Sequence, residues 1–286
     1  MSLPGRFLDI GSQRIFYHRA GQGKPLLLLH GYALSHWSWR RIVPALAAEH
    51  DVIAIDLPGF GESDRPRTVD FGYDALAYMQ IAVGVLDELG IERAAFVGHS
   101  MGGAVSLVTA ARYPDRVDRL VLVDPLVYPF RLPPEGYPLL LPYAGPALFQ
   151  ALSSRTMMRR FMTRLIYHDP SLVTDEWVDY VWERMNRPNG FLAAHAALRF
   201  IMQPASVAAS VRAVRAPVLV VWGEEDRLFP ASHARRLATD LPGAKVCLVP
   251  RCGHSPAEES PQAMLDAALP FLAERSARRP LAAVVS

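Results

Sequence analysis

A serine between two glycines, in the run Gly98-His99-Ser100-Met101-Gly102, is the first feature of this sequence that could do chemistry. An apolar run precedes it and a helix-favouring stretch follows, which predicts a strand-to-helix turn at Ser100. In a nucleophile elbow the serine sits in a strained conformation at such a turn, and the flanking glycines prevent collisions across it. Composition alone produces G-x-S-x-G about one time in ten in a chain of this length. A purely structural turn therefore stays the alternative until partners are found.

A serine hydroxyl becomes a good nucleophile only when a base takes its proton and a carboxylate orients that base. The chain offers nine histidines. His254 follows the last predicted strand, in the segment RCGHSPAEESP, where a loop at a strand's carboxyl end faces the same sheet edge as Ser100. His99 adjoins the serine, but strand alternation predicts that its side chain points away. His30 is expected to stabilise the loop at Gly31.

Two aspartates are candidates for the orienting carboxylate. Asp226 lies in the segment GEEDRLFP, directly after an apolar strand-like run. Asp124 ends another such run and would reach the same edge of a parallel sheet. The chain order serine, acid, histidine holds for both, so this order leaves the choice open.

The elements that must position these residues are short apolar runs that alternate with helical stretches. The sequences FLDI and RIFYHRA flank a turn at Gly11-Ser12 and predict an opening hairpin. Near-continuous apolar runs predict strands buried on both faces at 25–30, 51–56, 94–99, 119–124, 217–223 and 244–250. Helices are expected around 36–48, 74–89, 101–112, 231–240 and 261–275. This alternation predicts an α/β fold with a doubly wound, mostly parallel sheet of about eight strands.

No strand pattern appears between Asp124 and Pro217, where a proline-rich stretch is followed by helical segments. These segments are expected near 147–167, 171–186 and 191–202, with Asp169-Pro170 as the N-cap and first turn of the second one. A long helical insertion between two sheet strands is typical of a lid. We therefore expect a core domain of residues 1–124 and 211–286, with a helical cap of residues 125–210 inserted after the sixth strand. Residues 274–286 extend past the last predicted helix.

Ordered motifs from residue 25 to residue 272 resemble the α/β-hydrolase fold family, in particular its lidded members. These members include bacterial carboxylesterases, carbon–carbon bond hydrolases, epoxide hydrolases and haloalkane dehalogenases. The motifs are His30-Gly31-Tyr32, residues 56–63, the elbow at 98–102, Gly223-x-x-Asp226-x-x-x-Pro230, and Gly253-His254 with Glu259-x-Pro261. The resemblance implies a triad of Ser100, Asp226 and His254, with Asp124 at the position that some relatives use instead. It also implies an oxyanion hole formed by the backbone N–H groups of Tyr32 and Met101.

The residue types narrow the reaction that this resemblance implies. Epoxide hydrolases and haloalkane dehalogenases carry an aspartate at the elbow, whereas this chain carries Ser100. Hydroxynitrile lyases of the family need an active-site lysine, and neither Lys24 nor Lys245 is placed for that role. The leading expectation is a serine esterase. The alternative is a carbon–carbon bond hydrolase of β-diketones or ring-cleavage products with the same triad, and a ligand-binding member without turnover is a third reading. No cofactor and no metal is expected.

The predicted cap is rich in apolar and aromatic residues, while its arginines are expected to face solvent. An apolar ceiling over the site favours uncharged acyl or aryl groups. We therefore expect small to medium esters as substrates, with acyl chains of about C4 to C8, because each accommodated methylene adds up to ~0.8 kcal/mol. The arginines in question are Arg131, Arg155, Arg159, Arg160 and Arg164.

Composition argues against several other classes of protein. The chain has 286 residues, of which 51% are hydrophobic and 20% charged, and its net charge is +2 with scattered basic residues. Nothing in that pattern suggests a nucleic-acid partner. The apolar runs fall short of the ~20 residues that a membrane span needs, and the N-terminus lacks a signal-peptide pattern. We expect a cytoplasmic bacterial enzyme with a small-molecule partner. Its oligomeric state is open between monomer and homodimer.

Overall fold

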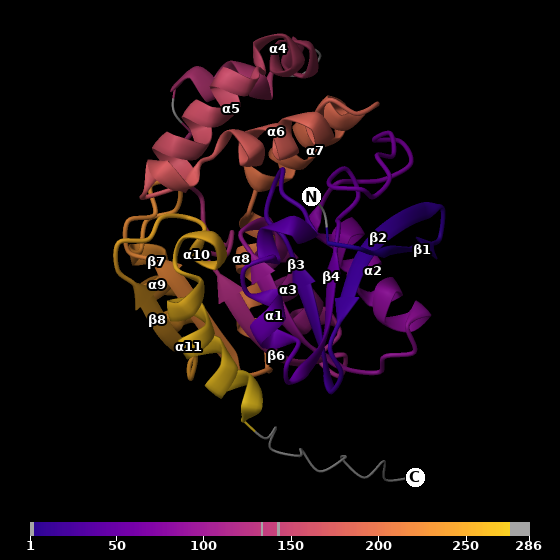
Figure 1. Cartoon of the computed structure of the whole chain (residues 1–286), viewed down its shortest axis with the longest axis vertical. Coiled ribbons are helices and arrows are strands. Elements are labelled where there is room, and N and C mark those ends of the chain that lie inside the picture. The colour runs from indigo at the N-terminus through magenta and orange to yellow at the C-terminus, as the bar shows by residue number, and fades with distance from the viewer. Residues whose placement is uncertain (1–2, 133, 142–143, 275–286) are drawn as a thin grey trace.

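One eight-stranded sheet, in the order β1-β2-β4-β3-β5-β6-β7-β8, forms the centre of the protein (Figure 1). The computed structural model describes residues 3–132, 134–141 and 144–274. The sheet is parallel except that β2 runs antiparallel to both β1 and β4. The strands are β1 (Arg6–Ile10), β2 (Gln13–Ala20), β3 (Lys24–Leu29), β4 (His50–Ile55), β5 (Ala94–His99), β6 (Val117–Val123), β7 (Val218–Gly223) and β8 (Lys245–Val249).

Three strands of the sheet are buried along their whole length, as their apolar sequences predict. Every residue of β4, β5 and β7 is buried. A strand covered by helices on both faces has no solvent side, so apolar residues occupy both alternating sets of positions. The predicted α/β fold with a mostly parallel sheet of about eight strands is confirmed.

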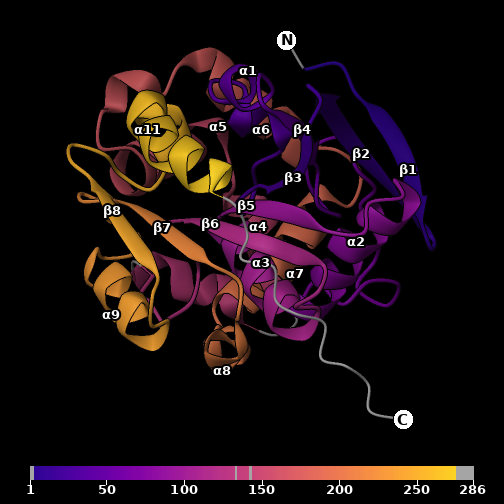
Figure 2. The same cartoon turned by 90° about the horizontal axis from the view of Figure 1, so that it is seen from below.

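Helices cover both faces of the sheet, which Figure 2 shows from below. The first face carries α1 (Val43–Leu46) and α11 (Pro261–Ala273), and the second carries α2 (Ala75–Glu88), α3 (Met101–Arg112) and α9 (Ser232–Asp240). A separate cluster of buried apolar side chains fills each of the two layers. The short helix α10 (Pro256–Glu259) precedes α11.

The described chain between β6 and β7 is helical. Among these elements α4, α5, α6 and α7 lie beyond one end of the sheet, in the upper part of Figure 1. The elements are η2 (Pro134–Leu140), α4 (Ala144–Leu152), α5 (Arg155–Phe161), the π-helical turn η3 (Met162–Ile166), η4 (Pro170–Leu172), α6 (Asp175–Met185), α7 (Gly190–Ile201), α8 (Ala205–Ser210) and η5 (Val211–Ala213). We keep the name cap for residues 125–210, although the boundaries of this proposed domain stay a prediction.

The prediction of one helix over 36–48 was wrong. The chain forms the 3₁₀ turn η1 (His36–Trp39) and then the separate short helix α1. Ser35 caps the first segment by accepting a hydrogen bond from the Trp37 N–H at 3.2 Å. Pro44 lies in the first turn of α1, where its missing N–H is tolerated. A proline at that point cannot continue the preceding helix, so the two segments stay separate.

Two predictions in the cap were also wrong in detail. The expected helix over 147–167 is interrupted before α5, which Ser154 caps by accepting a hydrogen bond from the Met157 N–H. Asp169 caps only the three-residue turn η4, and α6 starts later, behind its own cap Thr174. A capping side chain accepts a hydrogen bond from a free backbone N–H at the start of a helix, and so fixes where that helix begins. Apolar periodicity does not reveal this boundary. Most of the predicted C-terminal extension, from residue 275 onward, lies outside the described residues.

No helix in the described part of the chain is both long enough and apolar enough to cross a membrane.

Candidate active site

Ser100 lies in a strained turn between β5 and α3, as the elbow motif predicts. Its φ is +50° and its ψ is −113°, a conformation that non-glycine residues rarely adopt. A Cβ on Gly98 would lie 2.4 Å from the Ser106 Oγ, and one on Gly102 would lie 2.1 Å from the Leu29 carbonyl oxygen. Neither position accepts a larger residue. The turn therefore holds the Ser100 hydroxyl at the edge of the sheet.

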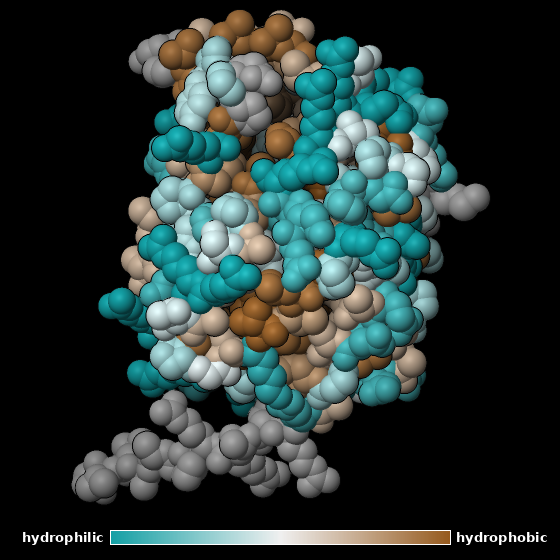
Figure 3. All heavy atoms as spheres, turned by 90° about the vertical axis from the view of Figure 1, so that its left-hand side faces the viewer, coloured by the Kyte–Doolittle hydropathy of each residue, from teal (hydrophilic) through white to brown (hydrophobic). Residues whose placement is uncertain are grey.

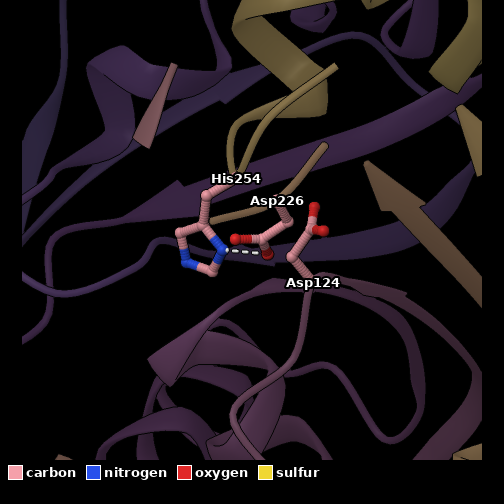
Figure 4. A group of neighbouring side chains, drawn as sticks. All are labelled: Asp124, Asp226 and His254. Carbon is pink, nitrogen blue, oxygen red and sulfur yellow. Dashed lines mark hydrogen bonds and ion pairs between the residues drawn. The ribbon is translucent and has the colours of Figure 1, made fainter. Parts of the chain in front are cut away.

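His254 is hydrogen-bonded to Asp226, and both side chains are buried (Figure 4). The distance from His254 Nδ1 to Asp226 Oδ2 is 2.7 Å. Asp226 Oδ1 also accepts hydrogen bonds from the N–H groups of Leu228 at 2.8 Å and Phe229 at 2.9 Å, which fix the carboxylate. Because a carboxylate only accepts, Nδ1 carries the proton and Nε2 presents a lone pair. Nε2 is buried without a partner among the described residues, so it is free to act as a base.

Ser100 and His254 line the same cavity. Within the described residues no hydrogen bond joins the two side chains. In hydrolases such a bond often forms only when substrate binds. Tyr32 also lines this cavity, and Met101 is the first residue of α3. Nothing in the described chain accepts a hydrogen bond from the backbone N–H of Tyr32 or Met101. Both groups are therefore available to a ligand.

Asp124 lies beside the pair but does not bond to His254 (Figure 4). Its Oδ1 accepts a hydrogen bond from the Gly223 N–H at 2.9 Å, while its Oδ2 has no partner among the described residues. Burial, together with the negative charge of Asp226, raises the pKa of the Asp124 carboxyl well above its usual value. Of the two aspartates that chain order left open, Asp226 is thus the one hydrogen-bonded to the histidine, while the surroundings of Asp124 favour its neutral form.

The His99 side chain, which the sequence predicts to point away from Ser100, makes a contact in the site that the sequence did not reveal. His99 Nε2 donates a hydrogen bond to the His254 carbonyl oxygen at 2.6 Å, and the ring lines the cavity. The loop that carries His254 thus lies against the His99 side chain at the end of β5. Burial first, and then the neighbouring His254, lower the pKa of His99 to about 3, so the ring stays a neutral donor. Since the two residues are 155 positions apart, no local sequence signal reveals this contact.

His30 stabilises the following loop, as predicted. Its Nε2 accepts a hydrogen bond from the Leu57 N–H at 2.9 Å, which leaves Nδ1 to donate to the Gly31 carbonyl at 2.7 Å. A second, unpredicted anchor is Asp56, which accepts from the backbone N–H and the Nδ1 of His36, at 2.6 and 2.8 Å, and from the Glu62 N–H at 2.7 Å. These bonds tie the loop that contains Tyr32 to the motif at 56–63.

Replacing Asp56 by alanine should lower the free energy of unfolding by about 3–5 kcal/mol, because His36 and the Glu62 N–H lose their buried acceptor. Burial opposes ionisation of Asp56, but the His36 ring and its hydrogen bonds outweigh it and hold the carboxyl pKa below its usual value. This contribution is therefore complete above the unfolded pKa of about 3.9 and declines as the pH falls towards the folded value. Denaturant unfolding at pH 7 and pH 3 measures both effects. A variant within 1 kcal/mol of the parent at pH 7 would contradict this account.

The cavity is small and its lining is mostly apolar, with His99 and Ser255 as polar residues beside Ser100 and His254. Its volume is about 60 Å³, against the roughly 300–1,000 Å³ of sites that hold a whole ligand. The cap contributes Met158, Phe161, Met162, Ile166, Tyr167 and Val181 to its wall. Among the described residues that line it there is no lysine, arginine, aspartate or glutamate. A cavity of this volume does not hold a whole substrate, so side chains that line it must move when one enters, and six of them belong to the cap.

The outer surface of the cap is also partly apolar. Figure 3 shows brown, hydrophobic atoms gathered at the top of the face that the cap forms, above a more hydrophilic middle. Exposed apolar side chains of the cap include Tyr137, Leu141, Leu152 and Met157. Two of the arginines expected to face solvent form surface ion pairs, Arg155 with Asp179 and Arg159 with Asp175.

The chain matches the model of a protein family described as alpha/beta hydrolase fold, over residues 24–261. It is 34% identical over 273 residues to a 2-hydroxy-6-oxo-6-phenylhexa-2,4-dienoate hydrolase from Burkholderia cepacia, with 91% of each chain covered. It is also 34% identical over 259 residues to a 2-hydroxymuconate semialdehyde hydrolase from Pseudomonas sp. strain CF600, with 87% of each covered.

A solved structure with a similar fold is a meta-cleavage product hydrolase from Pseudomonas fluorescens IP01. The two superpose with a TM-score of 0.80 at 29% sequence identity, over 94% of this chain and 97% of the other. These similarities agree with the expected hydrolase fold. The named relatives are carbon–carbon bond hydrolases, so they correspond to the alternative in the sequence analysis and not to its leading expectation of an esterase.

Proposed function

Because the chain belongs to the α/β hydrolase fold family, we propose that it is a serine hydrolase that cleaves a bond next to a carbonyl group through an acyl-enzyme. The observation that carries this proposal is the buried His254–Asp226 hydrogen bond, which leaves His254 Nε2 unpartnered in a cavity that Ser100 also lines. In this arrangement the base His254, the carboxylate of Asp226 that orients it, and the Ser100 hydroxyl lie at the same edge of the sheet.

The proposed reaction begins when His254 Nε2 takes the Ser100 proton and Oγ attacks the carbonyl carbon. The negative charge on the tetrahedral oxygen is stabilised by the backbone N–H groups of Tyr32 and Met101, and by the amino end of α3. Asp226 orients the imidazole and stabilises its protonated form. His254 then gives the proton to the leaving fragment and activates a water that hydrolyses the acyl-enzyme. The net reaction consumes one water and needs neither a metal nor a cofactor.

The proposed base and acid, together with the neighbouring Asp124, are also close enough to one another to be considered as metal ligands. Ligand atoms of Asp124, Asp226 and His254 all lie within 4.8 Å of one another. However, the His254 Nδ1 proton is held by Asp226 at 2.7 Å, and a nitrogen that carries a proton cannot coordinate a metal. The neutral form favoured for Asp124 also makes it a poor ligand. We therefore interpret His254 as a base and Asp226 as the carboxylate that orients it, and not as metal ligands.

The leading substrate class in this proposal is a ketone whose adjacent carbon–carbon bond is cleaved, in a ring-cleavage product or a β-diketone. The support comes from the two relatives at 34% identity, whose names describe oxo- or semialdehyde-bearing compounds of this kind. The leaving fragment is then a carbanion, so its electron pair must be delocalised into a carbonyl group, either directly or through a conjugated double bond. Protonation by His254 completes its departure.

A carboxylic ester is the second candidate, and the cavity lining favours it. The relatives named as dienoate hydrolases act on compounds that carry a carboxylate, whereas no lysine or arginine lies among the described residues that line the cavity. A buried carboxylate without a cationic partner is strongly disfavoured. An uncharged ester with an acyl chain of about C4 to C8 avoids that penalty and fits an apolar wall.

A comparison of kcat/KM for three substrate types tests the choice between a ketone and an ester as the substrate. The panel holds 2-hydroxy-6-oxo-6-phenylhexa-2,4-dienoate, an uncharged β-diketone and p-nitrophenyl esters from acetate to palmitate. We expect the β-diketone to exceed the best ester by about tenfold or more, a difference of about 1.4 kcal/mol in transition-state stabilisation. Because the lining has no cation, the β-diketone should also match or exceed the dienoate. A best ester tenfold faster than both ketones would replace the leading candidate with the second.

A further inference from the structure

The Glu259 carboxylate joins two segments that are far apart in the sequence. Its Oε1 accepts a hydrogen bond from the Gly253 N–H at 2.9 Å, and its Oε2 accepts one from the His168 N–H at 2.6 Å. The N–H groups of Ser255 and Asp169, each at 3.4 Å, add longer bonds to the same two oxygens. One oxygen therefore holds the loop of His254, and the other holds the cap segment that follows η3.

The two segments also touch through their backbones. The His254 N–H donates to the Ile166 carbonyl at 2.6 Å. A Cβ on Gly253 would lie 2.4 Å from the Ile166 carbonyl oxygen and 2.7 Å from the His168 nitrogen, so only glycine allows this approach. The position of His254 is thus linked to that of the cap segment by one direct hydrogen bond and by the Glu259 bridge.

The same cap segment forms a wall of the cavity. Met162, Ile166 and Tyr167 line it together with Ser100 and His254. The cavity of about 60 Å³ is too small for a whole substrate, so this wall must move when substrate enters. A displacement of the wall acts on the His254 loop through the contacts described above.

We propose that Glu259 is a positioning residue that couples the cap to the proposed base, so that His254 reaches its working position only when residues 162–168 are seated. This inference rests on the function proposed for His254. It also gives a role to the Glu259-x-Pro261 motif, which the reaction itself does not use. A misplacement of about 1 Å in a reacting group can cost about 10²-fold in rate. A small displacement of residues 162–168 would therefore be enough to slow the reaction.

Glu258 provides a matched control one residue away. Its carboxylate pairs with Arg40, and its carbonyl accepts a hydrogen bond from Arg41. None of its hydrogen bonds reaches the backbone of residues 166–169 in the part of the chain that the structure describes. Burial raises the pKa of both carboxyls, to about 7 for Glu258, so glutamine replaces a largely buried acidic group at each position.

The test measures how fast ethyl and octyl fluorophosphonates label Ser100 in the full-length protein. In this reaction Oγ bonds to phosphorus, fluoride leaves and the hydroxyl proton passes to His254. In Glu259→Gln the amide nitrogen cannot accept, so one of the two segments loses its anchor. We expect labelling to slow by about tenfold or more. The ratio of octyl to ethyl rates should also change by about fourfold, the equivalent of one methylene contact. Glu258→Gln should keep the parent's ratio even if its melting temperature falls.

Glu259→Asp is a second variant in case Glu259→Gln does not fold. It keeps the charge but is one methylene shorter, so it should not reach both anchors and should show the same change in ratio. Unchanged rates and an unchanged ratio in a folded Glu259 variant would overturn this inference alone. The same change of ratio in Glu258→Gln would overturn it as well. No labelling of the parent protein would overturn the proposed function, and this inference with it.

Discussion

Replacing Ser100 by alanine is expected to lower kcat by about 10³-fold or more on every substrate that the parent hydrolyses. The reason is that Oγ forms the bond to the substrate, and no other hydroxyl replaces it in the same geometry. The fold should remain, because the Ser100 hydroxyl makes no hydrogen bond to any residue that the structure describes, whereas the Ser100 N–H holds the elbow through the Val123 carbonyl at 2.9 Å. Steady-state kinetics and circular dichroism measure the two effects.

Ser100→Gly is the informative companion to this variant. Glycine adopts positive φ without strain, and Ser100 has a φ of +50°. We therefore expect the glycine variant to be inactive but more stable than Ser100→Ala, by about 1 kcal/mol in the free energy of unfolding. Retention of a tenth or more of the parent's activity by either variant would rule out Ser100 as the nucleophile.

Asp226→Asn should lower kcat by about 10⁴-fold, as removal of the orienting charge does in serine proteases. An amide in place of the carboxylate neither selects the Nδ1-protonated imidazole nor stabilises the imidazolium. Leu228 and Phe229 should still donate to the amide oxygen, so the loop should keep its shape. The measurement is kcat at several pH values for the parent and the variant.

Asp124→Asn is the matched control for this prediction. Burial and the charge of Asp226 raise the pKa of the Asp124 carboxyl and so favour its neutral form, and Asn is neutral too, so we expect the local charge to change little. Its carbonyl can still accept from the Gly223 N–H. We expect a loss of less than about tenfold in kcat, because His254 keeps its carboxylate partner. The opposite ranking, with Asp124→Asn the more damaging change, would transfer the role of orienting acid to Asp124.

The fold was predictable because its signals are local in the sequence. The run PVLVVWG is apolar at both alternating sets of positions, and β7 is buried throughout. The elbow was predictable for a similar reason, since only a strained turn requires Gly98 and Gly102 together. Sequence order, by contrast, left Asp124 and Asp226 equivalent as acids. The hydrogen bond of His254 to Asp226 distinguishes them, and it depends on where two loops end in space.

The supporting contacts were not predictable, because their partners are distant in the chain. Glu259 accepts from His168, 91 positions away, and His99 donates to a carbonyl 155 positions away. The motifs at 56–63 and 259–261 identified two of the segments involved, but not their partners. The predicted helix ends were wrong for another reason. Ser154 caps a new helix where apolar periodicity suggested a continuous one, and Thr174 caps a helix that begins later than periodicity suggested.

The most direct test of the account is to locate the covalent adduct that a fluorophosphonate leaves on the protein. The parent protein is labelled to completion, digested, and mapped by tandem mass spectrometry, with Ser100→Ala and His254→Ala treated in parallel. The account predicts one phosphonyl group, on Ser100, in the parent, none at that position in Ser100→Ala, and labelling slowed by about 10²-fold or more in His254→Ala. An unlabelled parent, or an adduct on any residue other than Ser100, would contradict it.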